Sequence, residues 1–208
     1  ITNYSAPQFG FLNNDFTYDV SFLPTYSVTV DDTIQPGFCI YPYSKQFISA
    51  TKDDCFIYLQ YYNNSVNEIY KVCDGGLRTL LYSPSAVNVT ALTTSTLGDY
   101  FFIAERTGIN GPHDLRKVST VTGAIDPNFT YQTPTGIISQ IVEAPNGKIY
   151  IIDNSTSTNT LKRLTSTGAV DGTFMTHDDI ASIALQSTGK VIAGGTFTNL
   201  SSLTRYNI

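Results

Sequence analysis

Short apolar segments alternate with polar turns along most of the chain, and this pattern predicts strands rather than helices. The clearest unit begins with an apolar strand at 136–142, turns at Pro145-Asn146-Gly147 and continues with a second strand at 148–152. Asn-Gly between two apolar segments is typical of a hairpin, for which we expect a type I′ turn with positive φ at both residues. A third strand at 161–164 and a closing element at 168–174 complete the unit.

The same arrangement recurs along the chain. The segment Thr122-Gly123-Ala124-Ile125-Asp126-Pro127-Asn128-Phe129 returns as Thr167-Gly168-Ala169-Val170-Asp171-Gly172-Thr173-Phe174. The segment Asn146-Gly147-Lys148-Ile149-Tyr150-Ile151 returns as Thr188-Gly189-Lys190-Val191-Ile192-Ala193. A period of about 42 to 48 residues built from strands and turns is typical of a β-propeller or a similar radial array. We therefore predict an all-β propeller in which each unit forms one blade of three to four strands.

About five such units account for the 208 residues as a single domain. We place the units at about 1–38, 39–82, 83–129, 130–174 and 175–208. Further strands are expected at 16–22, 26–30, 34–38, 47–51, 55–59, 69–72, 87–92, 100–104, 115–118, 125–129, 180–185, 190–193 and 203–206. The chain opens on Ile1 and stops inside a repeat, as a processed segment would. Either more chain follows, or a strand from the N-terminal residues completes the last unit and closes the ring, which would hide the sheet edges.

One unit carries a specific family pattern. It has an Arg-Leu pair, a turn Gly, an Asp followed by Phe, an Ile-rich strand, a Gln, then Gly-Lys and Gly-Gly-x-Phe. These are Arg163-Leu164, Gly168, Asp171, Phe174, Ile180, Ile183, Gln186, Gly189-Lys190 and Gly194-Gly195-Thr196-Phe197. This segment resembles the delta-60 repeat of bacterial β-propellers, clearly only over about residues 122–208. The preceding unit is also similar to an NHL repeat, through 134–137 and 146–151.

The delta-60 resemblance brings no catalytic residues, and it implies a surface or secreted protein. Similar repeats would also suit a phage tail or virion protein. WD and kelch repeats depend on Trp, which this chain lacks.

The composition limits the classes of partner that the protein is expected to bind. Only 14% of the residues are charged, against roughly 25% in an average soluble domain, and Ser, Thr and Asn fill the polar positions. The net charge of −5 comes without a basic run, which argues against nucleic acid. The longest apolar runs are about five residues, far short of a membrane span, so we expect no membrane insertion. Surfaces of this composition are common on secreted, cell-surface and virion proteins.

The cysteines allow one disulfide. Residues 55–59 and 68–73 are expected to form two strands, and a turn centred on Asn64 would place Cys55 directly opposite Cys73. Directly opposite residues in a hairpin lie about 4.5–5.5 Å apart, within disulfide range. The alternative is three buried free thiols, including Cys39, because free Cys is among the most buried residue types.

The residues that recur at matching places are expected to build the scaffold. Asp126 and Asp171 can cap the turns that follow them, and Phe129 and Phe174 can fill the space between blades. The turns are expected to use Gly147 and Gly189, while Gly194 and Gly195 let two backbones approach closely or support a bulge. The alternative for the two aspartates is a ring of carboxylates that binds a cation in a central channel.

Few residues in the sequence are candidates for catalysis or metal binding. His113 and His177 fall in predicted loops, where we expect solvated side chains, and two isolated His-Asp pairs do not supply a zinc site. No Gly-x-Ser-x-Gly nucleophile elbow occurs in the sequence. We expect no cofactor, with calcium on Asp178 and Asp179 as the alternative.

Tyrosines gather in one third of the chain. The cluster includes Tyr41, Tyr43, Tyr58, Tyr61 and Tyr62. Tyr offers an apolar face with a polar tip, which suits a ligand-binding surface. The alternative is that these side chains lie in the core or form cross-strand pairs.

These observations favour a non-enzymatic structural or recognition module on a cell or virion exterior, such as an adhesin or a phage tail or capsid-associated protein. Its partner would be another protein or a surface glycan, and association into oligomers would favour the virion. The alternatives are a carbohydrate-active enzyme or a calcium-dependent lectin that uses the propeller mouth.

Overall fold

The computed structural model describes residues 48–53, 55–61, 67–73, 78–84, 88–106, 111–133, 136–154, 158–186, 188–197, 199–200 and 203–204. Within these ranges the chain forms fifteen β-strands and no helix. The expected unit at 1–38 and the expected closing strand lie outside the described residues, as do Tyr41, Tyr43 and Tyr62.

The strands form four antiparallel meander sheets and a short terminal hairpin. The first sheet contains β1 (Ile48–Ala50), β2 (Phe56–Tyr61), β3 (Asn67–Val72) and β4 (Arg78–Tyr82). The second sheet contains β5 (Asn88–Thr94), β6 (Tyr100–Arg106), β7 (His113–Ser119) and β8 (Tyr131–Thr133). The third contains β9 (Ile138–Glu143), β10 (Ile149–Asp153) and β11 (Thr160–Leu164), and the fourth contains β12 (Ile180–Leu185) and β13 (Val191–Gly195). The hairpin pairs β14 (Asn199–Leu200) with β15 (Leu203–Thr204).

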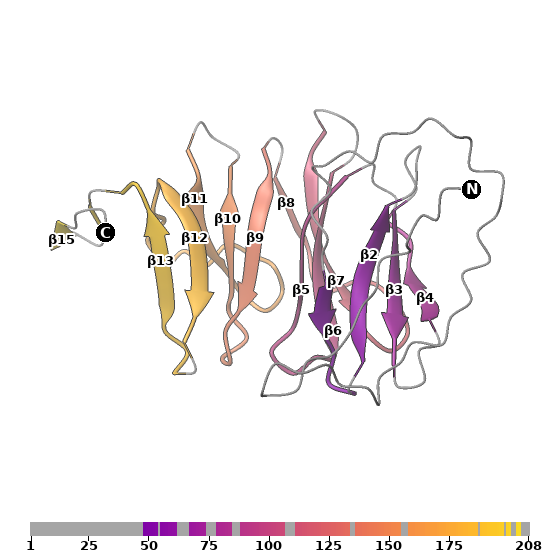
Figure 1. The fold of residues 1–208 in the computed structure, drawn as a ribbon. Helices are drawn as coiled ribbons and strands as arrows, with labels where there is room; N and C mark the ends of the chain where they lie inside the picture. The colour runs from indigo at the N-terminus through magenta and orange to yellow at the C-terminus, as the bar shows by residue number, and fades with distance from the viewer. Residues whose placement is uncertain are drawn as a thin grey trace, which may run out of the picture.

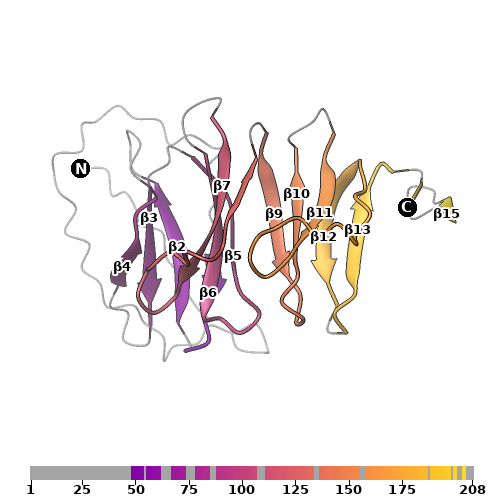
Figure 2. The ribbon, with the colours of Figure 1, turned by 180° about the vertical axis from the view of Figure 1, so that it is seen from behind.

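The four sheets stand side by side in chain order, which Figure 1 and the reverse view in Figure 2 both show. The first strand of each sheet packs on the first strand of the next: β1 on β5, β5 on β9 and β9 on β12. Meander sheets that follow one another through their first strands are the blades of a β-propeller. The all-β propeller prediction is therefore confirmed.

Side chains connect the first strands where no backbone ladder joins them. The Ser49 hydroxyl on β1 accepts from the Thr94 backbone N–H on β5 at 3.1 Å. The Thr90 hydroxyl on β5 donates to the Ile138 carbonyl on β9 at 2.7 Å. The Gln140 amide on β9 donates to the Ile183 carbonyl on β12 at 2.6 Å and accepts from its N–H at 2.8 Å. Each pair of neighbouring sheets among the four is thus joined along its first strands.

A separate hydrophobic core fills each space between successive sheets. On β6, Phe101 and Ile103 face the first sheet, whereas Phe102 and Ala104 face the third. The strand β10 repeats this division between its two neighbours. A middle strand is therefore buried on both faces, which explains why the second strand of each unit is a run of apolar residues instead of alternating with polar ones.

The hairpin turns differ from the expected type. In the turn between β9 and β10, the Ala144 N–H donates to the Lys148 carbonyl and the Gly147 N–H donates to the Ala144 carbonyl, both at 2.8 Å. Only Gly147 has positive φ, at 75°. The loop therefore has three residues, a type I turn followed by a left-handed glycine, and Pro145 suits its second position. The type I′ expectation was wrong because Asn146 keeps negative φ.

The closing elements also differ from the expected strands. Ile125 makes a single bridge to Val118, and the fourth strand of the second sheet forms later, at β8. In the third sheet Val170 bridges Leu164 in the same way. The residues that follow Ile125 and Val170 form an aspartate-capped turn instead of a strand. The other strands expected within the described ranges lie within a few residues of their predicted bounds.

The closing elements at 122–129 and 167–174, called closing hairpins below, lie against the preceding blade, with a glycine at each contact. A Cβ on Gly123 would overlap the Leu81 carbonyl oxygen, and a Cβ on Gly168 would overlap that of Thr130. Both glycines have positive φ. We expect Gly123→Ala and Gly168→Ala each to lower the free energy of unfolding by about 2–3 kcal/mol, because the backbones must separate and the left-handed conformation is strained. Urea-induced unfolding of the full chain measures the loss.

The matched control is Gly172→Ala, in the same hairpin as Gly168. A Cβ there meets nothing within 4 Å, and the φ of Gly172 is not positive. Its cost should stay below about 1 kcal/mol. Equal losses in Gly168→Ala and Gly172→Ala would contradict the close approach between blades.

Candidate functional site

A buried polar tie links the first sheet to the second, and an equivalent tie links the second sheet to the third. Tyr82, the last residue of β4, donates to Glu105 Oε1 at 2.5 Å, and Glu105 Oε2 accepts from Arg116 Nε at 3.3 Å. Tyr131, the first residue of β8, donates to Asp153 Oδ2 at 2.8 Å, and the same oxygen accepts from Lys162 Nζ at 2.6 Å. Each tie combines a tyrosine, a carboxylate and a cation.

Both carboxylates of these ties are inaccessible to solvent. Glu105 is 1% exposed and Asp153 is 0% exposed. Burial raises the pKa of Glu105, and burial together with the carboxylate acceptor raises the pKa of each tyrosine hydroxyl. Such buried groups are costly unless they are paired. The ties therefore fix how neighbouring blades sit and do not offer an exposed acid or base.

The recurring aspartates cap turns that follow the third strands of the second and third sheets. Asp126 Oδ1 accepts from the Asn128 N–H at 2.9 Å, and Asp171 Oδ1 accepts from the Thr173 N–H at 3.0 Å. The Thr173 hydroxyl and Lys148 hold the pKa of Asp171 well below its usual range. Both aspartates belong to closing hairpins on the third strands, so they do not meet at the first strands.

The phenylalanines that follow these aspartates pack against the second strand of their own sheets. The Phe129 and Phe102 ring centroids lie 5.6 Å apart, and those of Phe174 and Tyr150 lie 5.7 Å apart. Phe129 is buried in the core between the second and third sheets. The Asp-x-x-Phe repeat thus builds the scaffold.

The Gly-Gly pair marks where the tie is missing. Gly195 occupies the place on β13 that Asp153 occupies on β10, counted from the preceding hairpin turn. The Asp179 carbonyl oxygen lies where a Cβ of Gly195 would be, and it accepts from the Thr196 N–H at 3.0 Å. The pairing also shifts between Ile180 and Ser182. Both a close approach and a bulge occur here.

An open hollow lies on the second sheet beside its closing hairpin, with a volume of about 410 Å³. It is lined by Tyr100, Ser119, Thr122, Ala124, Ile125, Asp126, Pro127 and Asn128. The Lys117 ammonium lies 4.2 Å from the centroid of the Tyr100 ring and 3.4 Å from Asp126 Oδ2. The hollow therefore combines an aromatic ring, one carboxylate and several neutral polar groups, and Lys117 contacts both the ring and the carboxylate.

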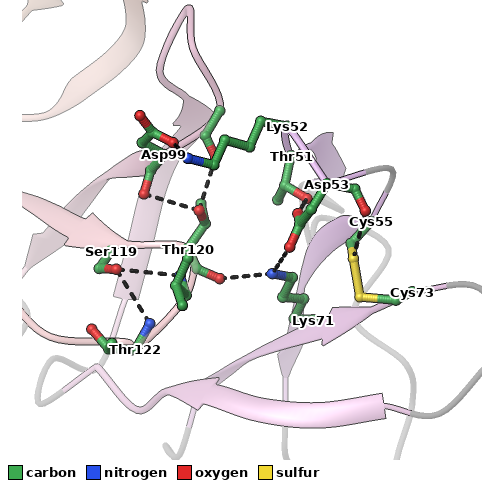
Figure 3. Close-up of polar contacts among 12 residues, drawn as sticks. Thr51, Lys52, Asp53, Cys55, Lys71, Cys73, Asp99, Ser119, Thr120 and Thr122 are labelled. Carbon is green, nitrogen blue, oxygen red and sulfur yellow. Dashed lines mark hydrogen bonds and ion pairs between the residues drawn. A yellow bond between two sulfur atoms is a disulfide. The ribbon is translucent and has the colours of Figure 1, made fainter.

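A cluster of polar contacts holds the turn that carries Ser119 and Thr122, two of the residues that line the hollow (Figure 3). Lys71 Nζ donates to Asp53 Oδ2 at 2.5 Å and to the Thr120 carbonyl at 3.0 Å. The Lys71 hydrogen bond lowers the pKa of Asp53. The Thr120 hydroxyl in turn donates to the Gly98 carbonyl at 2.8 Å, and the Ser119 hydroxyl accepts from the Thr122 N–H at 3.2 Å. The turn that carries Ser119 and Thr122 is thus held in place.

The disulfide lies at the base of this cluster. Cys55 and Cys73 are joined, in the register expected for a turn centred on Asn64, because Phe56 pairs with Val72 and Tyr58 with Tyr70. The two sulfurs lie near an Asp53 carboxylate oxygen. Because the disulfide uses both sulfurs, they do not provide the thiolates that a metal site needs.

Other candidate residues lie apart from this hollow. Tyr58 is buried at 8% exposure and stacks on Tyr70, so it is a core residue and not a ligand-binding surface residue. Asp178 Oδ1 accepts from the Thr160 hydroxyl at 2.6 Å, and both Asp178 and Asp179 are exposed. Within the described ranges these two carboxylates do not belong to a group of three metal-ligating side chains. Calcium there stays a prediction.

The loop assignment of His113 was wrong. His113 begins β7, because this strand starts two residues before the apolar Leu115. Its side chain is 0% exposed. Its Nδ1 lies 3.4 Å from the Thr90 hydroxyl, and its Nε2 has no hydrogen-bond partner within the described structure. A polar His-Asp pair preceding the apolar segment gave no signal of burial. His177 is half-buried and forms an isolated bridge with Leu161.

Comparison with known proteins shows similarity in fold and does not identify an activity. No protein-family model matches the sequence, and no curated protein sequence matches it. A solved structure of a functionally unknown protein from Desulfotomaculum acetoxidans is 16% identical with a TM-score of 0.51, covering 71% of this chain and 47% of that chain. A Lactobacillus plantarum protein is 13% identical with a TM-score of 0.49, covering 71% and 47%.

A third similar structure is the C-terminal WD40 domain of Sif2, which is 16% identical with a TM-score of 0.47, covering 71% of this chain and 44% of that one. The chain thus spans about half the length of these solved structures. At such identities the likeness concerns the fold alone. Among the described residues no helix is long and apolar enough to cross a membrane.

The ties between blades can be tested with two equivalent substitutions. We expect Tyr82→Phe and Tyr131→Phe each to lower the free energy of unfolding by about 1–3 kcal/mol, because each leaves a buried carboxylate without its hydroxyl donor. Chemical denaturation of the full chain measures both losses. Leu97→Ala, at a side chain that is 75% exposed, is the control and should cost less than about 0.5 kcal/mol. A loss no larger than the control would contradict the tie.

Buried His113 makes stability depend on pH. Burial and nearby Arg106 lower its pKa, against the opposing charges of Asp153 and Asp114. Unfolded histidine titrates near about pH 6.5, so below that pH the unfolded state takes up the proton more readily than the fold. We expect stability to fall as pH drops from about 7.5 to 5, with this group contributing at most about 1.4 kcal/mol per pH unit.

The variant His113→Gln should flatten this dependence, whereas Leu97→Ala, at an exposed side chain that does not titrate, should keep the wild-type slope. Thermal unfolding of the full chain across the pH range measures all three slopes. Equal slopes for His113→Gln and the wild type would show that another group carries the effect.

Proposed function

We propose that this protein is a non-enzymatic structural or recognition module that acts outside the cell, on a cell surface or a virion. The supporting observation is the use made of its buried carboxylates. Within the described ranges these are Glu105, Asp153 and Asp171, and each is paired with a cation and hydrogen-bonded to a hydroxyl donor. A general acid or base needs access to a substrate, whereas these groups join strands and blades.

The disulfide supports the proposed location, since disulfides persist in oxidising compartments such as the cell exterior. The delta-60 resemblance of residues 163–197 supports the same setting, because such repeats suit surface and secreted proteins. An open hollow lined by polar groups and an aromatic ring suits a binding surface. We therefore favour recognition of a surface glycan or a protein partner.

A binding screen combined with a turnover screen tests this function. The full chain is applied to a broad glycan array and to a panel of surface proteins, with and without calcium, after its folding is checked by circular dichroism. The proposal predicts saturable binding to at least one target and no product release from a polysaccharide panel. Reproducible turnover would overturn the non-enzymatic proposal. Binding that disappears with a chelator would instead favour a calcium-dependent lectin.

A further inference from the structure

We propose that the hollow beside Tyr100 binds a neutral carbohydrate. The inference rests on the recognition function proposed above, and it assigns that function to a site. Its starting point is a departure from the repeat, because residues that recur build the scaffold and a change at one copy needs another reason.

The departure is visible when the second and third sheets are compared. Tyr100 directly precedes β6 residue Phe101, which pairs with Val118, and Lys148 directly precedes Ile149, which pairs with Leu164. Val118 and Leu164 each bridge to the closing hairpin of their own sheet. Tyr100 and Lys148 therefore occupy the same place in the two blades.

In the third sheet this place is filled by an ion pair. Lys148 Nζ lies 2.9 Å from Asp171 Oδ2, and Arg163 Nε donates to the same oxygen at 2.9 Å. In the second sheet Asp126 is paired, among the described residues, with Lys117 alone, at the longer distance of 3.4 Å. A carboxylate has about four acceptor positions, so Asp126 keeps acceptor capacity at the edge of the hollow.

The chemistry of the lining favours a neutral sugar. The charges of Asp126 and Lys117 balance each other, so the hollow attracts neither a strongly anionic nor a strongly cationic ligand. Tyr100 lines the hollow, and the face of its ring that Lys117 does not cover offers an apolar surface for the C–H face of a pyranose. The carboxylate and the side chains of Ser119, Thr122 and Asn128 offer donors and acceptors that sugar hydroxyls need. A volume of about 410 Å³ is within the usual range of ligand sites.

The polar contacts that hold the lining of the hollow lower the cost of binding. The Lys71 contact to the Thr120 carbonyl fixes the turn of Ser119 and Thr122, and the disulfide holds the strand pair that carries Lys71 (Figure 3). A site that is already ordered loses less conformational entropy when a ligand binds.

The test uses the full chain and an array of neutral hexose and N-acetylhexosamine oligosaccharides. Titration calorimetry then measures the affinity for the best glycan on that array. Tyr100→Lys gives the second sheet the residue of the third, so that an ion pair with Asp126 fills the hollow. We expect it to weaken binding at least about tenfold, and we expect Tyr100→Phe, which keeps the ring, to weaken it less. Val170→Ala, at the exposed residue equivalent to Ile125, should bind like the wild type.

The outcomes separate this site from the wider function. Glycan binding that Tyr100→Lys leaves unchanged would overturn the hollow and leave recognition intact. A folded wild type that binds no neutral glycan would overturn the carbohydrate assignment. Binding of a peptide or surface protein that is sensitive to Tyr100→Lys would also overturn it, because the hollow would then be a protein site.

Discussion

Each middle sheet of this protein must bury both of its faces, and it can do so only against its neighbours. Phe101 and Ile103 on one side of β6, and Phe102 and Ala104 on the other, belong to two different cores. A single blade therefore has no core of its own. In such arrays stability arises from interfaces between repeats. The apolar runs, the glycines at blade contacts and the buried ties all follow from this requirement.

Apolar packing alone does not fix how two sheets sit on each other, because many offsets bury a similar area. The ties of Tyr82 with Glu105 and of Tyr131 with Asp153 add direction, since a buried carboxylate accepts its donors only in a narrow geometry. The interface between the third and fourth sheets has Gly195 in place of the carboxylate, and its first strands are joined by two hydrogen bonds between the Gln140 amide and the Ile183 backbone. The same blade plan is thus held by two kinds of polar contact.

Much of the fold could be predicted because it depends on local patterns. In the strand pair next to Cys55 and Cys73, Phe56 pairs with Val72 and Tyr58 with Tyr70, so counting residues outward from Asn64 was enough to predict the register. Polar contacts between blades could not be predicted in this way. His113 and Glu105 look like ordinary polar residues at strand ends, and the assembled sheets bury them. The turn at Asn146 was misassigned because Pro145 lengthens the loop by one residue.

The candidate site was missed for a related reason. The sequence drew attention to a tyrosine cluster that contains the buried Tyr58, whereas Tyr100, which lines the hollow, lies outside that cluster. The useful signal was a comparison between repeats at one position, where Tyr100 stands in place of Lys148. That comparison needs the strand pairing, because the two segments share little sequence around this position. In a repeat protein, positions that match explain the scaffold, and positions that differ while the scaffold is kept are where a specific function can be added.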